Sequence, residues 1–283
     1  MTTGTPIRSW RVIATAALAG LVLATAPGLS LAVDQPGALA RARVAYNQQR
    51  FDEAIAAARE ARRVPETASA AQLLLARALI ERYRIAGDAA DLATAREALS
   101  LIDPSKLMPR DRGEMQIGLA ESLFLDDRFG AAADLFEDAM SRTGEQGYAP
   151  RERLLGWFAT SLDRQARLEE TPARRRIYRR LLDRMSRENR VGSGSAVASY
   201  WVVVATFGAD DVADAWDAAV ATWIRAPLIP GDGVALRADL DRFVLAGIIP
   251  RLAKLASGGT DAEPAAEAFR KDWESVKQTW PIR

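Results

Sequence analysis

The chain has 283 residues, of which 49% are hydrophobic and 27% charged, and its formal net charge is +1. This composition is typical of a globular protein, and the balanced charge argues against nucleic-acid binding, which usually needs a strongly basic domain. The sequence has no cysteine and no histidine. It therefore has no disulfide framework, no thiolate or imidazole metal ligand, no cysteine nucleophile and no histidine base. We expect no metal, no cofactor and no catalysis.

The first 32 residues have the features of an export signal. Arg8 and Arg11 supply a positive start, and residues 12–26 (VIATAALAGLVLATA) form an apolar stretch that is short for a membrane span. Ser30, Leu31 and Ala32 fit a small-residue cleavage site. We expect cleavage after Ala32, no transmembrane span in the mature chain, and a periplasmic or secreted protein. Retention of the segment as an anchor is the alternative.

Beyond residue 33 the apolar and small residues recur at helical spacing in paired segments. RFDEAIAAAREA (50–61) and RFGAAADLFEDA (128–139) are near-copies, and each follows another helical segment across a short polar turn. We expect the aspartates of the turns, at 126–127 and 210–211, to cap the helices that follow. The predicted core of the second copy is Ala120, Phe129, Ala132, Phe136 and Ala139.

These hairpins resemble the tetratricopeptide repeat, a helix–turn–helix unit of about 34 residues. The first copy matches its small and aromatic positions at Ala42, Phe51, Ala54 and Ala61, and looser copies occupy residues 71–104, 151–185 and 199–227. The resemblance implies an all-α fold in which residues 33–228 form a right-handed superhelix of about five stacked antiparallel hairpins, a TPR-like α-solenoid. Residues 229–283 are expected to form a C-terminal helical cap.

Two segments need separate treatment. Residues 200–207 (YWVVVATF) are β-branched and aromatic, but their neighbours have helical spacing, so we expect a buried helix there. In the C-terminal segment Pro250 must kink or split a long helix. The last helix is expected to pack with one face, formed by Phe269, Trp273, Val276 and Trp280.

The resemblance also implies a groove, lined by the first helix of each hairpin, that holds a protein or peptide segment. The positions of this chain that match the groove positions of the family are Arg43, Tyr46, Asn47, Arg77, Glu81, Glu121, Phe124, Arg153, Trp157 and Tyr200. A second candidate contact, for an anionic surface, is the arginine run at Arg175, Arg176, Arg179 and Arg180, for which a solvated outer helix face is the favoured explanation.

We therefore expect an exported, non-catalytic interaction scaffold or assembly adaptor of the cell envelope. One alternative is the ligand-binding subunit of an envelope transport system, which would need an internal apolar tunnel. Another is a glycan-acting enzyme that uses two carboxylates, for which Glu121 and Glu81 are the candidate pair.

Overall fold

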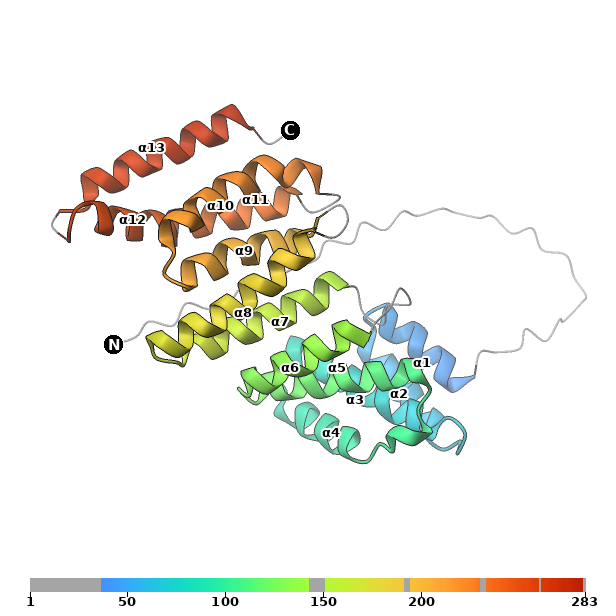
Figure 1. Ribbon diagram of the computed structural model, residues 1–283. Coiled ribbons are helices and arrows are strands. Elements are labelled where there is room, and N and C mark those ends of the chain that lie inside the picture. The colour runs from blue at the N-terminus through green and yellow to red at the C-terminus, as the bar shows by residue number, and fades with distance from the viewer. Residues whose placement is uncertain (1–36, 143–150, 191–193, 230–232, 260, 282–283) are drawn as a thin grey trace, which may run out of the picture. The chain divides into compact units, whose positions relative to one another are not determined.

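The computed structural model describes residues 37–142, 151–190, 194–229, 233–259 and 261–281. Within these ranges the regular elements are all helices, which confirms the all-α fold (Figure 1). The export segment and its cleavage site lie outside the described residues. Within the described part, no helix is long and apolar enough to cross a membrane.

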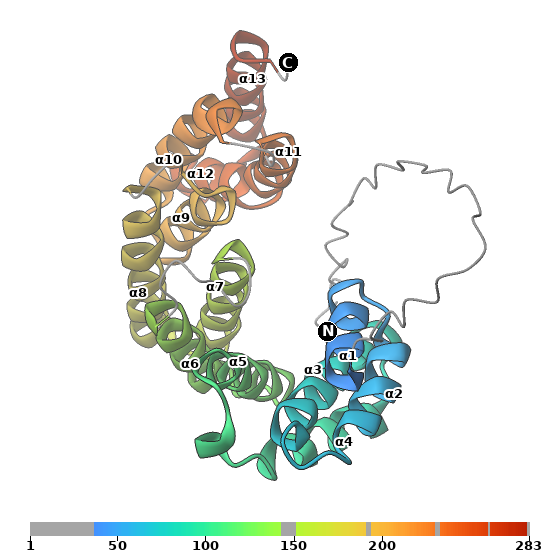
Figure 2. The same cartoon turned by 90° about the vertical axis from the view of Figure 1, so that its right-hand side faces the viewer.

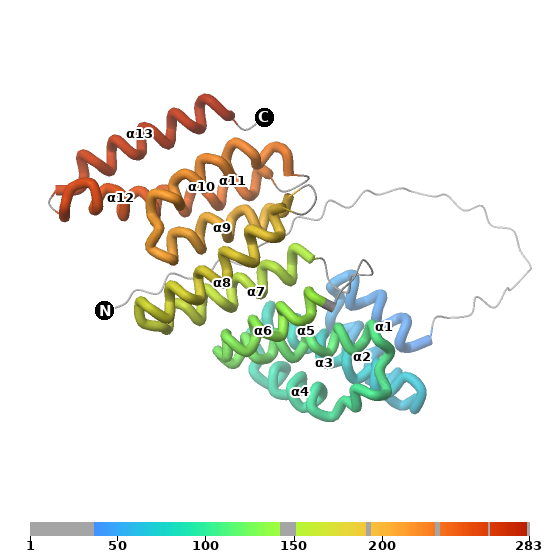
Figure 3. Tube along the Cα trace, viewed as in Figure 1, coloured from blue at the N-terminus to red at the C-terminus, as the bar shows by residue number. Residues whose placement is uncertain are grey.

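Ten helices follow one another as five pairs, and each helix packs against the next in the chain. Short turns separate the two helices of a pair, so the chain reverses direction at each turn (Figure 3). The pairs are α1 Ala38–Asn47 with α2 Phe51–Ala61, α3 Ala68–Ala86 with α4 Ala89–Ser100, α5 Pro109–Leu125 with α6 Phe129–Arg142, α7 Arg151–Arg167 with α8 Thr171–Arg190, and α9 Ala196–Gly208 with α10 Val212–Arg225. The β-branched stretch at 200–207 lies inside α9, which confirms the expected helix.

First helices also contact one another across the pairs. Helix α1 packs on α3, α3 on α5, and α7 on α9. In Figure 2 the first helices α3, α5, α7 and α9 lie along one side, and their partners α4, α6, α8 and α10 lie along the other. Side chains of several first helices therefore meet on one side of residues 36–283, which form one compact unit.

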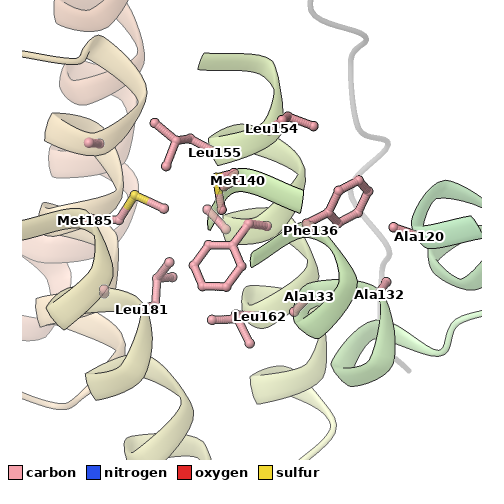
Figure 4. Packing of buried hydrophobic residues seen from close by; sticks show 14 of the residues in the cluster. Ala120, Ala132, Ala133, Phe136, Met140, Leu154, Leu155, Leu162, Leu181 and Met185 are labelled. Atoms are coloured by element: carbon pink, nitrogen blue, oxygen red, sulfur yellow. The ribbon is translucent and has the colours of Figure 1, made fainter. Parts of the chain in front are cut away.

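The core consists of three clusters of buried side chains that follow the chain order. The first lies among α1–α5, the second among α5–α9, and the third among α9–α13. In the middle cluster Phe136 is fully buried, and its ring lies on the side of Leu154 and Ala120, whereas Leu181 and Met185 lie across the cluster (Figure 4). The five core residues predicted for this hairpin are all buried, at Ala120, Phe129, Ala132, Phe136 and Ala139.

The aspartates in the turns meet the capping expectation only in part. Asp211 occupies the N-cap position of α10, but its side chain makes no capping hydrogen bond, and Asp126 ends α5 instead. The carboxylates instead reach other helices, since Asp126 pairs with Arg96 and Asp210 lies 2.8 Å from Arg175 Nη2. Each turn contains a residue in the left-handed backbone conformation, Asp127 at φ 57° and Asp210 at φ 72°.

After α10 the chain forms a short 3-10 turn, η2 Ala226–Leu228, as it does earlier at η1 Pro104–Lys106. The C-terminal segment then contains α11 Gly233–Phe243, a π-helical turn η3 Val244–Ile248, α12 Ile249–Ala256 and α13 Glu263–Thr279. The π-turn ends two residues before Pro250, which lacks a backbone N–H and crowds the preceding turn, so the predicted break is confirmed. Trp273 is fully buried, but Trp280 lies beyond the end of α13 and is 48% exposed.

Candidate interaction site

The centre of the site is a buried ion pair between two first helices. Arg77 on α3 and Glu121 on α5 are both buried, and Arg77 Nη1 lies 3.0 Å from Glu121 Oε2. Arg77 Nη2 also donates a hydrogen bond to the Tyr46 hydroxyl at 3.2 Å and lies 3.6 Å from Glu114 Oε2. Glu114 and Glu121 are two helical turns apart, so both carboxylates face α3.

Arg153, on α7, extends this pair to a third helix. Its Nη2 donates a close hydrogen bond to Glu81 and lies 3.4 Å from Glu121 Oε1. Glu81 also accepts a hydrogen bond from Arg84 Nη1 at 2.7 Å. We call Tyr46, Arg77, Glu81, Arg84, Glu114, Glu121 and Arg153 the charged cluster.

Burial determines how the charged cluster titrates. Removal from water raises the pKa of the Glu121 carboxyl, and the neighbouring Arg77 only partly opposes this shift. Burial also works against the charge of Arg77, but the Glu121 carboxylate, Tyr46 and the Glu114 carboxylate together raise its pKa above the ordinary value. Arg77 therefore stays protonated, and the ionised form of Glu121 is the costly member of the pair.

Aromatic rings continue the site beside the charged cluster. Phe124 on α5 and Trp157 on α7 lie edge to face with ring centroids 4.8 Å apart. The Arg84 guanidinium lies 4.7 Å above the Trp157 ring, and Arg164 lies 5.3 Å above Phe124. Such cation–π contacts hold arginines over half-buried rings.

Most of the groove residues expected from the sequence come together in space. The contacts above join seven of them, which are Tyr46, Arg77, Glu81, Glu121, Phe124, Arg153 and Trp157. Arg43 pairs with Asp111 at 3.2 Å, and Asn47 is exposed near the end of α1. Tyr200 is not joined to them, since its ring packs on Trp201 and Phe243.

No family model, curated protein or solved structure matches this chain. The side-chain geometry is therefore the basis for a functional conclusion. Arg84, Glu114 and Arg164 belong to the site but were missed from the sequence. Helical spacing could have found Arg84 and Glu114, which lie three residues after Glu81 and seven before Glu121.

The charges of the site divide between interior and surface. Arg77 and Glu121, which the sequence placed on a groove wall, have almost no exposed surface because α1, α3, α5 and α7 close around them. The exposed charges are the side chains of Arg43, Arg84 and Arg153, whereas their partners Glu81 and Asp111 are nearly covered. The accessible part of the site is thus positive, with half-buried aromatic rings beside it.

Two further expectations can be located in the structure. Glu81 and Glu121 do meet, at Arg153, but Glu121 offers no exposed surface to a glycan, and both carboxylates are held by arginines.

In the arginine run of α8, Arg175 pairs with Asp210, and Arg180 pairs with Asp134 and Glu137. Arg176 and Arg179 are exposed and form no ion pair with another described residue.

Proposed function

We propose that this chain is an exported scaffold or adaptor of the cell envelope that binds a segment of a partner protein on the side built from its first helices. It acts by binding alone. Residues 1–32 supply the argument for export. We further propose that the hairpins continue as a right-handed TPR-like superhelix with α11–α13 as its cap. The sequential packing of the pairs and their buried alanines support this arrangement.

The observation that carries the proposal is the division of charge in the site. The carboxylates of Glu81, Glu121 and Asp111 are buried or nearly covered, whereas the guanidinium groups of Arg43, Arg84 and Arg153 are exposed, so the surface offered to a partner is cationic. The arginines stay in place because buried carboxylates and aromatic faces hold them, which lowers the entropy lost on binding. Phe124 and Trp157 add the apolar anchors that dominate binding hot spots. The bound segment is therefore acidic and carries apolar or aromatic side chains.

A random peptide display library tests this function because it samples many candidate segments at once. The mature chain should enrich peptides rich in aspartate and glutamate beside aromatic or aliphatic residues. The Arg43→Gln/Arg84→Gln variant neutralises two exposed cations and keeps an amide at each position. It should lose the acidic enrichment.

The matched control is Arg176→Gln/Arg179→Gln, which removes the same charge from the exposed face of α8. This control should recover the same acidic peptides as the original chain. Equal loss in both variants would mean that net charge alone attracts the peptides. Absence of acidic enrichment from the original chain would contradict the proposed function.

A further inference from the structure

A separate pocket lies where the C-terminal helices meet. It has a volume of about 690 Å³ and is bordered by the end of α10, the η2 turn, the start of α11 and the end of α13. This volume lies within the range of roughly 300–1,000 Å³ that is usual for small-molecule sites. Its lining is mostly apolar, and includes Ile224, Leu228, Val234, Trp280 and Pro281.

Apolar surface at this pocket remains open to solvent. Leu228, Val234 and Trp280 are 77%, 60% and 48% exposed, and they are among the large hydrophobic side chains that the described residues leave uncovered. All three border the same pocket. Clustered exposed apolar residues mark a binding surface more strongly than single ones do.

The pocket also contains a buried cation without a carboxylate partner. Arg237 lines the wall and is only 3% exposed. Its Nε donates to the Trp223 carbonyl at 3.0 Å, its Nη1 donates to the Pro281 carbonyl at 2.9 Å, and its guanidinium lies 4.8 Å from the Trp223 ring centroid. Among the described residues it forms no ion pair.

Arg77 provides the comparison within the same chain. Arg77 and Arg237 are the two arginines that are buried among the described residues. Arg77 faces the carboxylates of Glu121 and Glu114, whereas Arg237 faces only neutral carbonyl groups and an aromatic ring. A guanidinium has five N–H donors, and the two bonds to carbonyls leave the others for a ligand. Burial without a counter-charge lowers the pKa of Arg237, so an added anion would relieve a real electrostatic cost.

We propose that this pocket binds a small amphiphile with one carboxylate head group and an apolar tail. The carboxylate pairs with the Arg237 guanidinium, which presents the forked donors that carboxylates match. The tail covers Leu228, Val234 and Trp280. This site shares no residue with the charged cluster, and it adds a small-ligand function to the proposed protein binding.

Calorimetric titration with dodecanoate and dodecanol, both below their aggregation concentrations, tests the assignment. The two probes have the same tail, and only dodecanoate carries a charge. Dodecanoate should bind at least tenfold more tightly than dodecanol. Equal affinities, or no binding of dodecanoate, would overturn the proposal.

Variants assign the binding to this pocket. Arg237→Gln should bind both probes alike, while Arg237→Lys should keep part of the preference for dodecanoate. Val234→Asp changes an exposed side chain, so it should leave the melting temperature unchanged and abolish binding of dodecanoate. Leu255→Asp, at an equally exposed residue outside the pocket lining, is the matched control and should bind normally. If Arg237→Gln does not fold, Val234→Asp decides, and undiminished binding in that variant overturns the proposal.

Discussion

Phe124 and Trp157 lie edge to face, 4.8 Å apart, although they belong to α5 and α7 of different hairpins. Trp157 also stacks on the fully buried Phe136, at 5.7 Å and 18°. The same indole ring thus has one side in the core and another beneath the Arg84 guanidinium at the surface. It links the binding surface to the stability of the middle core cluster.

The first prediction separates binding from stability. Phe136→Ala should lower the free energy of unfolding by about 3–5 kcal/mol, because it opens a void in a closed part of the core. Phe124→Ala/Trp157→Ala should weaken capture of acidic peptides by roughly 2 kcal/mol or more, on the scale of interface hot spots. Its melting temperature should fall less than that of Phe136→Ala, because both rings are half-buried.

Arg176→Ala is the surface control for these two variants, and it should lower the free energy of unfolding by less than about 0.5 kcal/mol. Arg175 is a poorer control because it pairs with Asp210. Denaturant unfolding and peptide titration measure the two effects separately. If the double variant unfolds at room temperature, the rings belong to the core and the binding surface lies elsewhere.

The second prediction concerns the buried pair. Arg77→Met removes the cation and leaves the Glu121 carboxyl buried without its main partner, and should destabilise the fold by about 3–5 kcal/mol. Arg77→Met/Glu121→Leu removes both charges and should recover much of that loss. Urea unfolding of the two variants gives the comparison. A double variant less stable than Arg77→Met would show that the pair is net stabilising and that its loss cannot be compensated by apolar packing.

The third prediction is a pH dependence. Burial raises the pKa of Glu121 in the folded chain, so the folded state holds that proton more tightly than the unfolded state. The stability contributed by Glu121 is present below the ordinary glutamate pKa and is lost as pH rises through the folded value. The groups that face the carboxyl are Arg77, Glu81, Arg84 and Arg153.

Glu121→Gln isolates this contribution because other titrations cancel in the difference. The unfolding free energy of the original chain, minus that of Glu121→Gln, should decrease as pH rises from 4 to 7. Chemical denaturation at a series of pH values measures it. A difference that increases with pH would mean that the ion pair with Arg77 outweighs burial.

The fourth prediction uses two helical glycines. A Cβ at Gly208 would lie 2.5 Å from the ring of Tyr178, whose hydroxyl is held by Asp163 at 2.8 Å. Gly208→Ala should therefore destabilise by about 1–3 kcal/mol through overpacking. Gly156→Ala meets no atom within 4 Å in the middle of α7 and should stabilise by about 0.5–1 kcal/mol. Thermal melts of the two variants should shift in opposite directions, and a common direction would contradict the packing of α8 on α9.

The fifth prediction concerns export. Mass spectrometry of the chain isolated from cells that make it naturally should find an N-terminus at or next to Val33. The reason is that residues 1–32 contain a positively charged start, then an apolar stretch and then a cleavage site of small residues. A retained Met1 or Thr2 would instead indicate an anchored protein.

Much of the helical architecture could be predicted from the sequence, because the information is local. Small and apolar residues at three- and four-residue spacing predicted the hairpins, and the core positions Ala132, Phe136 and Ala139 are buried as expected. Pro250 marked the break in the C-terminal helix correctly, since a π-turn ends two residues before it. The role expected of Asp126 was wrong, since its carboxylate pairs with Arg96 on another helix, and Asp211 is at the N-cap position of α10 without a side-chain capping bond.

The tertiary structure decided which charges are inside and which are outside. Arg77 and Arg84 are one residue type on one helix, yet Arg77 is enclosed and Arg84 is at the surface. Arg237 likewise has no local signal for burial, and its position depends on Trp223 and Pro281, 14 and 44 residues away. Helix spacing assigns a residue to a face, but the burial of that face depends on the helices that pack against it. Only the assembled chain determines this, because the cost of burying a charge depends on partners brought from distant helices.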